Sequence, residues 1–357
     1  MKPALKTLME RLPDGVDGAI ITSDANRRYF TDMKSSAGAL LITRSAAQFI
    51  IDFRYIEKAK SVITDFEVLL QSDDYYGQIG QFFQAQNAKR IAVESDFVTV
   101  GQFHRYGEKL PALEWQGGSA LADEINALRA VKSPEEVAFI EKAQSITDAT
   151  FTHMCGLIRP GMTELEIAVE MEYHMRKLGA SGLAFDSIVA SGVNSSMPHA
   201  VPSEKKVEIG DFVTMDFGAS YNGYCSDMTR TVAVGQVSAE QKRVYDTVLT
   251  AQRLAIEAIP KSRLYSEVDA AARDYIYAQG YEGCFGHGLG HSLGLYIHED
   301  PRFSPSCGEE MQKDVIVTVE PGVYLEGKFG VRIEDMVLLT GGEPRDLTHS
   351  EHELICL

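Results

Sequence analysis

The sequence predicts a mixed α/β (α+β) fold in two domains: a small α/β domain at residues 1–125 and a larger domain at residues 126–357 with two related halves. A chain of 357 residues can bury more than one core and commonly splits into two domains. The first third alternates short β-rich runs with polar, helix-like stretches. The remainder contains two pairs of helix patterns, and β-rich sequence follows each pair.

The first domain is expected to combine five strands with amphipathic helices. The N-terminal stretch MKPALKTLMERL places Leu5, Leu8, Met9 and Leu12 on one helical face. Polar stretches such as RYIEKAKSVI and YGQIGQFFQAQN fit helices between the strands. The one histidine of this domain, His104, stands alone, so we assign the domain no chemistry. The predicted strands are GAIITS (18–23), GALLIT (38–43), QFIID (48–52), EVLLQ (67–71) and RIAVES (90–95).

Helix-start signals organise the second domain. SPEE at 133–136 is a capping box, in which the Ser and Glu side chains each accept from the other residue's backbone N–H, and it predicts a long helix. A second capping box at 163–166 predicts a helix that ends at Gly179. A similar design recurs at residues 238–280, where a break near Pro260 separates a long helix from a shorter one.

Composition and charge exclude several classes of protein. The formal net charge is −17 without any basic run, which argues against a nucleic-acid or anionic-membrane partner. No apolar run approaches the length that crosses a bilayer, and the N-terminus lacks the apolar core of a signal peptide. The five cysteines are odd in number and form no CxxC pair, so we expect a reducing cytoplasmic location.

Two pairs of carboxylates lie in β-rich sequence. In residues 208–235, Asn222-Gly223 predicts a tight hairpin turn, and a symmetric hairpin makes Asp216 and Asp227 diagonal neighbours on one face. Their Cα atoms would be roughly 7–8 Å apart, within reach of a shared cation.

The second pair consists of Glu320 and Glu334, which would lie opposite each other if the loop between them is symmetric about Gly327. Both are embedded in apolar β sequence, where a bare carboxylate is costly to bury unless it is paired or metal-bound.

The stretch GHGLGHSLGLYIHED at 286–300 contains His287, His291 and His298. Its glycines make a zinc-binding helix improbable, and the glycine pattern of a dinucleotide-binding loop is incomplete. Alternating apolar residues favour an extended segment, in which His291 and His298 would face opposite sides. Each of these residues alone has an ordinary structural interpretation, and only their occurrence together indicates a site.

The ordered set MDFG, SDMTRT, GHGLGHSLGLYIHE, VTVEPG and VRIEDM resembles the metallopeptidases of the pita-bread fold, which include methionine aminopeptidase, aminopeptidase P and prolidase. The resemblance spans residues 126–357 and implies a pita-bread domain with two pseudo-symmetric halves. The preceding domain is similar to the N-terminal domain of creatinases, prolidases and aminopeptidases P through SSAGALLIT and DFRY. That match is looser, because DMK precedes SSAG where a GxTG-like segment is common.

The resemblance implies two divalent metal ions, with Mn favoured over Co or Zn. In the family pattern Asp216 binds one metal, His291 and Glu320 bind the other, and Asp227 and Glu334 bridge the two. Residues of this kind suit the chemistry, because converging carboxylates repel unless cations neutralise them. A water between the metals would be the nucleophile, and Glu320 would shuttle its proton.

The same resemblance implies roles for further residues. His199 and His298 match two substrate-side histidines, which would hydrogen-bond the carbonyl oxygen of the substrate. Arg332 matches an arginine that supports a ligand carboxylate. His287 is a candidate substrate-binding residue, and Arg302 is a candidate group for gripping the substrate's terminal carboxylate.

The implied activity is hydrolysis of Xaa-Pro bonds in short proline-containing peptides, by a metallopeptidase that forms a homodimer. The presence of the first domain argues against methionine aminopeptidase. Arg302 favours a dipeptidase (prolidase), and the alternative is an Xaa-Pro aminopeptidase acting on longer peptides. A non-catalytic peptide-binding relative and a creatinase-like hydrolase that needs no metal are the remaining alternatives.

Overall fold

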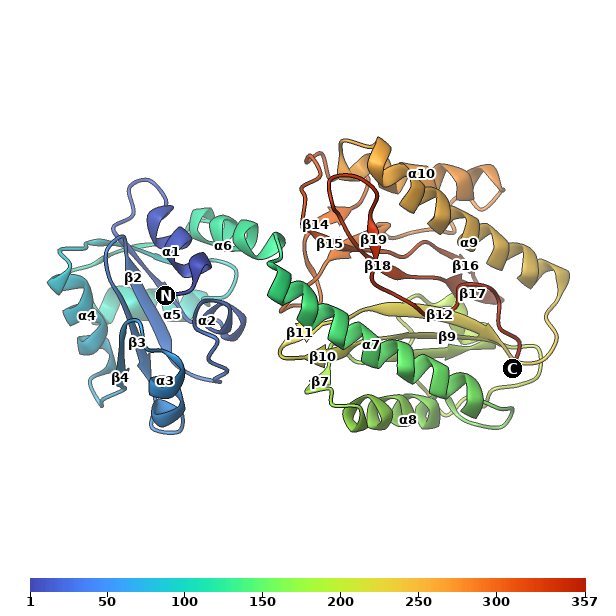
Figure 1. Ribbon diagram of the computed structural model, residues 1–357, viewed down its shortest axis with the longest axis horizontal. Helices are drawn as coiled ribbons and strands as arrows, with labels where there is room; N and C mark the ends of the chain where they lie inside the picture. Colours follow the sequence, from blue (N-terminus) through green and yellow to red (C-terminus); the bar gives the residue numbers. More distant parts are fainter. The chain divides into compact units, whose positions relative to one another are not determined.

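The computed structural model describes all 357 residues and divides into two units, Met1–Arg129 and Ala130–Leu357 (Figure 1). Helix α6 (Ala120–Ala130) runs across the expected boundary at 125/126, so the first unit ends near the end of this helix. No helix in either unit combines the length and the apolarity that crossing a bilayer requires.

The first unit is one six-stranded sheet in the order β4-β3-β2-β1-β5-β6, surrounded by helices. The β1–β2 and β2–β3 pairs are antiparallel, and the other pairs are parallel. The five predicted strands are confirmed as β1 (Gly18–Ile21), β2 (Ala39–Thr43), β3 (Ala47–Ile51), β4 (Glu67–Leu70) and β5 (Arg90–Val93). The predicted helices are α1 (Pro3–Glu10), α3 (Ile56–Val62) and α4 (Tyr75–Ala85), while α2 (Asp24–Thr31), α5 (Val100–Lys109), α6 and β6 (Glu114–Gln116) were not predicted.

A buried carboxylate of the first unit is fully used in the fold. Glu94, after β5, accepts hydrogen bonds from the backbone N–H groups of Thr22 and Ser23 and from the Asn26 amide. Ser23 is the N-cap of α2, so Glu94 fastens the start of that helix to the sheet. The hydrogen bonds of Glu94 therefore have a structural role in the first unit.

The second unit contains two helix pairs. α7 (Pro134–Leu157) and α8 (Glu164–Lys177) begin at the two predicted capping boxes, and both boxes are formed. α9 (Ala239–Ala258) begins with a third capping box at Ser238, and a 3-10 turn at Pro260 separates it from α10 (Tyr265–Ala278). Figure 1 shows the strands of this unit between the two pairs. The predicted repetition of helix pair and β-rich segment is therefore present.

The strands of the second unit form small antiparallel sheets. The ligand candidates lie in or beside strands of three of them: β8-β9-β12, β14-β13-β15-β18-β19 and the pair β16-β17. A short sheet of β7, β10 and β11 flanks the first of these. The strands are β7 (Gly182–Leu183), β8 (Ile188–Ser191), β9 (Phe212–Phe217), β10 (Ala219–Tyr221), β11 (Tyr224–Cys225), β12 (Met228–Ala233), β13 (Gly290–Ser292), β14 (Glu299–Phe303), β15 (Ile316–Val319), β16 (Gly322–Leu325), β17 (Phe329–Arg332), β18 (Asp335–Leu338) and β19 (Arg345–Asp346).

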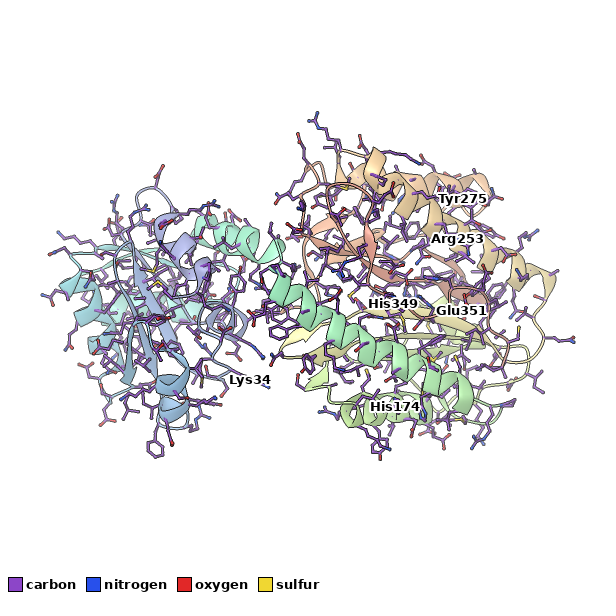
Figure 2. The ribbon with its side chains drawn as sticks, in the orientation of Figure 1. Lys34, His174, Arg253, Tyr275, His349 and Glu351 are labelled. Carbon is purple, nitrogen blue, oxygen red and sulfur yellow. The ribbon has the colours of Figure 1, made fainter.

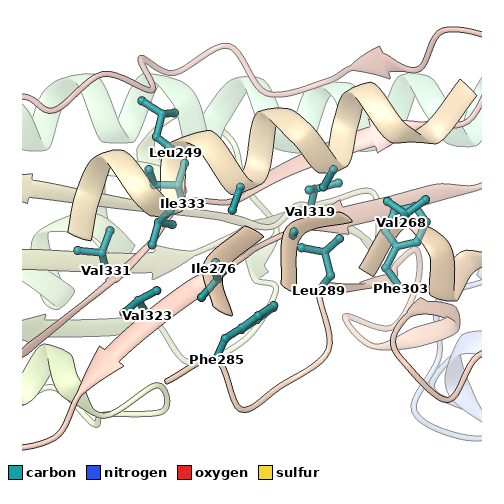
Figure 3. Close-up of a cluster of buried hydrophobic side chains, with 14 of the residues drawn as sticks. Leu249, Val268, Ile276, Phe285, Leu289, Phe303, Val319, Val323, Val331 and Ile333 are labelled. Carbon is teal, nitrogen blue, oxygen red and sulfur yellow. The ribbon is translucent and has the colours of Figure 1, made fainter. Parts of the chain in front are cut away.

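Each helix pair covers its own apolar core. On the α9–α10 side, Leu249, Val268 and Ile276 pack with strand residues such as Val319 and Val331 (Figure 3). A separate cluster joins α7 and α8 to the inner residues of β9 and β12. Burial of these apolar faces holds the strand ends in place, and the polar residues discussed next lie at those ends.

Candidate metal centre

The hairpin that carries Asp216 and Asp227 has the predicted register. Asp216 pairs with Thr229 across β9 and β12, and the turn residues Asn222 and Gly223 have φ angles of 51° and 79°. The ladder is interrupted between β9 and β10, so Asp227 lies just before β12 and outside the paired residues. Asp227 consequently lies at the break in the hairpin, and Asp216 lies one residue before the end of β9.

Glu320 and Glu334 also follow the expected symmetry about Gly327. The pairs Gly322–Arg332 and Val319–Asp335 flank them in one continuous register, which puts the two glutamates opposite each other. Neither glutamate lies within a named strand, so both side chains extend from strand ends. Thr229 Oγ1 donates to Glu334 Oε2 at 2.6 Å, and Thr318 Oγ1 donates to Glu320 Oε1 at 3.2 Å.

The expectation of one extended segment from His291 to His298 is wrong. β13 ends at Ser292, the chain turns, and β14 pairs back onto β13 with a register shift between His291 and Ser292. The turn brings the two rings together in an edge-to-face contact with centroids 4.5 Å apart. Strand parity therefore gave the wrong facing for His298, because the segment reverses direction.

Gly290 explains part of the glycine content of this stretch. A Cβ atom at this position would lie 1.9 Å from the backbone oxygen of Thr318. Only glycine lets β13 approach β15 this closely. His291, the next residue, is thereby held against the strand that leads to Glu320.

His291 faces three carboxylates as a neutral imidazole. Its Nδ1–H donates to the Ser292 carbonyl at 3.0 Å, which leaves the Nε2 lone pair free. Nε2 lies 3.6 Å from Asp227 Oδ2 and 3.4 Å from Glu320 Oε1, and atoms of Asp227, His291 and Glu334 all lie within 4.8 Å of one another. Burial lowers the pKa of His291 to about 3. Acceptor atoms facing one another at these distances repel unless a proton or a cation lies between them, and this group could hold a metal ion.

The carboxylates themselves fit divalent cations. Asp216 Oδ1 and Asp227 Oδ1 are buried and have no hydrogen-bond partner, a costly state for a carboxylate oxygen. Burial, followed by the charge of Asp216, raises the pKa of Asp227, and burial followed by the charge of Asp227 raises that of Glu334. Burial also raises the pKa of Glu320 to about 8. An oxygen-rich set with one imidazole suits Mn, Co or Zn.

Arg332 hydrogen-bonds one carboxylate of this set, which agrees with the role that the resemblance implies. Its Nη2 donates to Asp216 Oδ2 at 2.6 Å and its Nε donates to Thr229 Oγ1 at 3.0 Å. Its Nη1 donates to the Tyr324 hydroxyl at 2.8 Å, and that hydroxyl bonds His287 Nε2 at 3.0 Å. No sequence pattern indicates this role of Tyr324, because the contact depends on the β16–β17 pairing.

His287 lines the pocket, but both of its ring nitrogens bond within the protein. Nδ1 donates to the Gly288 carbonyl at 2.8 Å, and Nε2 accepts from Tyr324. Burial lowers the pKa of His287 to about 4, so the ring is neutral. Neither ring nitrogen is free to bond a substrate in this structure, and the substrate-binding role of His287 stays a prediction.

A pocket of about 670 Å³ surrounds the centre. All five predicted ligands line it, together with His199, His287, His298, Arg302 and Arg332. Its apolar walls come from residues that the sequence analysis missed, among them Phe185, Ile188 and Ile297. Phe185 and Ile188 lie on one segment that leads into β8, and Ile297 lies in the turn before β14. No local pattern distinguishes them from other apolar residues.

Buried carboxylates converging with a neutral imidazole in an open pocket, on a fold of two helix-covered halves, are typical of a metal-dependent enzyme. Residues 138–341 match metallopeptidase family M24, and residues 3–131 match the creatinase/prolidase N-terminal domain. The chain belongs to metallopeptidase family M24.

Individual relatives match this chain over nearly its whole length. The uncharacterized peptidase YqhT of Bacillus subtilis is 42% identical over 343 residues, which are 96% of each protein. A solved Xaa-Pro dipeptidase from Bacillus anthracis is 38% identical, covers 99% of this chain and 98% of its own, and superposes with a TM-score of 0.93. A solved X-Pro aminopeptidase from Thermotoga maritima is also 38% identical, covers 96% and 98%, and has a TM-score of 0.90.

Proposed function

We propose that this protein hydrolyses Xaa-Pro peptide bonds with two divalent metal ions, and that its preferred substrates are dipeptides. The observation that carries the proposal is the convergence of His291 with Asp227, Glu320 and Glu334, next to unpartnered oxygens of Asp216 and Asp227. The similarity to an Xaa-Pro dipeptidase and an X-Pro aminopeptidase, each 38% identical, supports proline-containing substrates.

Two cations held by Asp216, Asp227, His291, Glu320 and Glu334 would activate a water molecule and polarise the scissile carbonyl. Glu320 would accept the proton of the attacking water and pass it to the leaving nitrogen. Thr318 restricts the Glu320 side chain by donating to Oε1, so the carboxylate is oriented before substrate binds.

His298 and His199 would stabilise the charge that develops on the carbonyl oxygen. Both line the pocket, and His298 lies against the His291 ring. The segment with His199 is tied to the centre, because Arg332 Nη1 donates to the Pro198 carbonyl at 3.3 Å. Donors that are positioned before the reaction stabilise an oxyanion more than flexible donors do.

Arg302 favours dipeptides over longer peptides. It pairs with His291 across β13 and β14, lines the pocket, and leaves half of its side chain exposed. A guanidinium there would bind the carboxylate of a substrate that ends at proline. The alternative is an Xaa-Pro aminopeptidase, in which longer peptides pass this residue.

The proposal is tested with a panel of Xaa-Pro, Xaa-Pro-Xaa and Xaa-Ala peptides and metal analysis of the same preparation. We expect proline-dependent turnover that rises with bound metal, two ions per chain, and loss of turnover in Glu320→Gln. Glu326→Gln, an exposed residue in the adjacent hairpin turn, is the matched control. Undiminished turnover in a chelator would contradict the proposal, and creatine hydrolysis without added metal would favour the creatinase-like alternative.

We further propose that Mn is the preferred metal, that the protein is a homodimer and that it acts in the cytoplasm. Metal dependence of turnover, light scattering and cell fractionation test the three statements separately.

A further inference from the structure

The turn between His291 and His298 depends on a close backbone approach. The Gly294 carbonyl accepts from Cys225 N–H at 2.8 Å, and the Gly294 N–H donates to the Tyr296 carbonyl at 2.9 Å. A Cβ atom on Gly294 would lie 2.9 Å from Glu299 Oε1. The turn therefore wraps around the carboxylate of Glu299, the residue that follows His298.

Glu299 links the turn to a buried lysine. Its Oε1 accepts from Tyr296 N–H at 3.0 Å, and its Oε2 lies 3.4 Å from Lys132 Nζ. The same Nζ donates to Ser292 Oγ at 3.1 Å. The Lys132 side chain is 1% exposed and that of Glu299 is 9% exposed.

Lys132 thus contacts both ends of the turn. Ser292 is the last residue of β13, and Glu299 is the first residue of β14. Lys132 itself is fixed, because its N–H donates to the Asp314 carbonyl at 2.7 Å and the next residue caps α7. Neither Lys132 nor Glu299 lines the pocket.

We propose that Lys132, through Glu299, is a positioning residue for His298. The inference rests on the role given to His298 under the proposed function. The ammonium holds Ser292 and Glu299 together and so fixes where the turn returns the His298 ring beside His291. A ring displaced by about 1 Å would lose much of its effect on the oxyanion, whereas ground-state binding would change little.

If Lys132 had a purely structural role, a different result would be expected. Replacing one member of a buried ion pair leaves the other charge uncompensated and destabilises the fold, whereas replacing both with neutral groups often restores stability. If Lys132 only stabilises the fold, a neutral pair should restore turnover as well. If Lys132 positions His298, stability returns and turnover does not.

The experiment compares Lys132→Met, the double variant Lys132→Met/Glu299→Gln and the control Lys142→Met, an exposed position on α7. Measurements are Tm, bound metal, and kcat and KM for an Xaa-Pro dipeptide that the wild type cleaves. In the double variant we expect Tm and metal content near the wild-type values, kcat lower by about 10- to 100-fold and KM changed by less than about threefold. Because the double variant removes both members of this ion pair, it remains informative if Lys132→Met does not fold.

Wild-type kcat in the double variant would overturn the inference, as would a loss of kcat that only follows lost metal. Failure of the wild type to cleave any Xaa-Pro peptide would instead count against the proposed function. A crystal structure of the double variant gives a readout without activity. The His298 ring should leave its contact with His291, now 4.5 Å between centroids, and an unmoved ring would refute the positioning role.

Discussion

Arg332 donates from Nη2 to Asp216 Oδ2 at 2.6 Å, and both side chains are largely buried. The same guanidinium donates to Thr229 Oγ1, and Thr229 in turn donates to Glu334 Oε2. One arginine therefore orients two of the carboxylates that we assign to the metal ions. The planar fork of donors makes this geometry specific to arginine.

Arg332→Lys should weaken metal binding although it keeps the positive charge. A lysine ammonium cannot reach Asp216, Thr229 and Tyr324 in the same fixed geometry. Loss of a hydrogen bond that orients a ligand costs about 10- to 100-fold in metal affinity or activity. Titration calorimetry with Mn measures the affinity, and Arg253→Lys on the exposed side of α9 is the control. Unchanged affinity in Arg332→Lys would show that Asp216 is held by other contacts.

Removal of the metal should lower both activity and Tm. Without cations, the buried carboxylates face one another with unpartnered oxygens, whereas bound metal stabilises only the folded chain. A ligand at 100 times its Kd contributes about 2.7 kcal/mol of stability. Differential scanning calorimetry measures Tm, and a peptidase assay measures activity. Both are carried out before chelation, after chelation, and after Mn, Co or Zn is added back. If activity and Tm are both unchanged by a chelator, no metal centre exists.

The contribution of Glu320 to the stability of the metal-free protein should be lost as pH rises from about 4.5 to about 8. In the folded, metal-free chain burial raises the pKa of Glu320 from 4.5 to about 8, so this carboxyl binds more protons in the folded state than in the unfolded state across this interval. The free energy of unfolding therefore decreases with pH. Urea unfolding in a chelator at pH 5 and pH 8 measures the change. Glu320→Gln should reduce the difference between the free energies of unfolding at pH 5 and pH 8. If the variant shows the same difference as the wild type, other groups cause the pH dependence.

Arg230 should be far more important for stability than a surface arginine. Its buried guanidinium donates to Asp335 Oδ1 and to the Ser350 and Glu351 carbonyls, and so holds the C-terminal segment, in which Figure 2 labels His349 and Glu351. Arg230→Met leaves Asp335 buried without its cation, which costs about 3–5 kcal/mol.

The matched control for Arg230→Met is Arg253→Met, which removes an exposed pair with Glu353 and should cost less than about 1 kcal/mol. Urea denaturation measures both variants. If both variants lose a similar amount of stability, His352 and Gln252, which also contact Asp335, stabilise its carboxylate without the guanidinium.

Local patterns predicted the parts of the fold that local forces determine. The Asn222-Gly223 turn and the symmetry about Gly327 fixed two hairpin registers, because turn geometry and strand pairing act over a few residues. The turn before His298 was missed. It is stabilised by the Lys132–Glu299 contact, whose members are 167 positions apart, and alternation of apolar residues carries no information about such a pair.

The site was only partly predictable from its residues. Composition and pattern identified two carboxylate pairs and a histidine-rich stretch, but the ligand roles came from a family resemblance. The contacts that assemble the centre are tertiary: Thr229 reaches Glu334 across 105 positions and Arg332 reaches Asp216 across 116. The hydrogen bonds from Arg332 to Tyr324 and between Tyr324 and His287 are tertiary contacts too, and residue patterns carry no information about them.

Arg302→Ala should separate dipeptidase from aminopeptidase activity. If Arg302 binds the terminal carboxylate of an Xaa-Pro dipeptide, its removal eliminates a charge-assisted hydrogen bond of about 1.5–3 kcal/mol, equivalent to about a 10- to 100-fold loss in kcat/KM. The loss should appear mainly in KM, because the contact forms in the ground state. Xaa-Pro-Xaa peptides place their carboxylate elsewhere, so their turnover should change little. Arg345→Ala, at an exposed arginine of β19, is the control. Efficient tripeptide cleavage together with unchanged dipeptide cleavage in Arg302→Ala would instead identify an aminopeptidase, because no substrate carboxylate would then depend on this guanidinium.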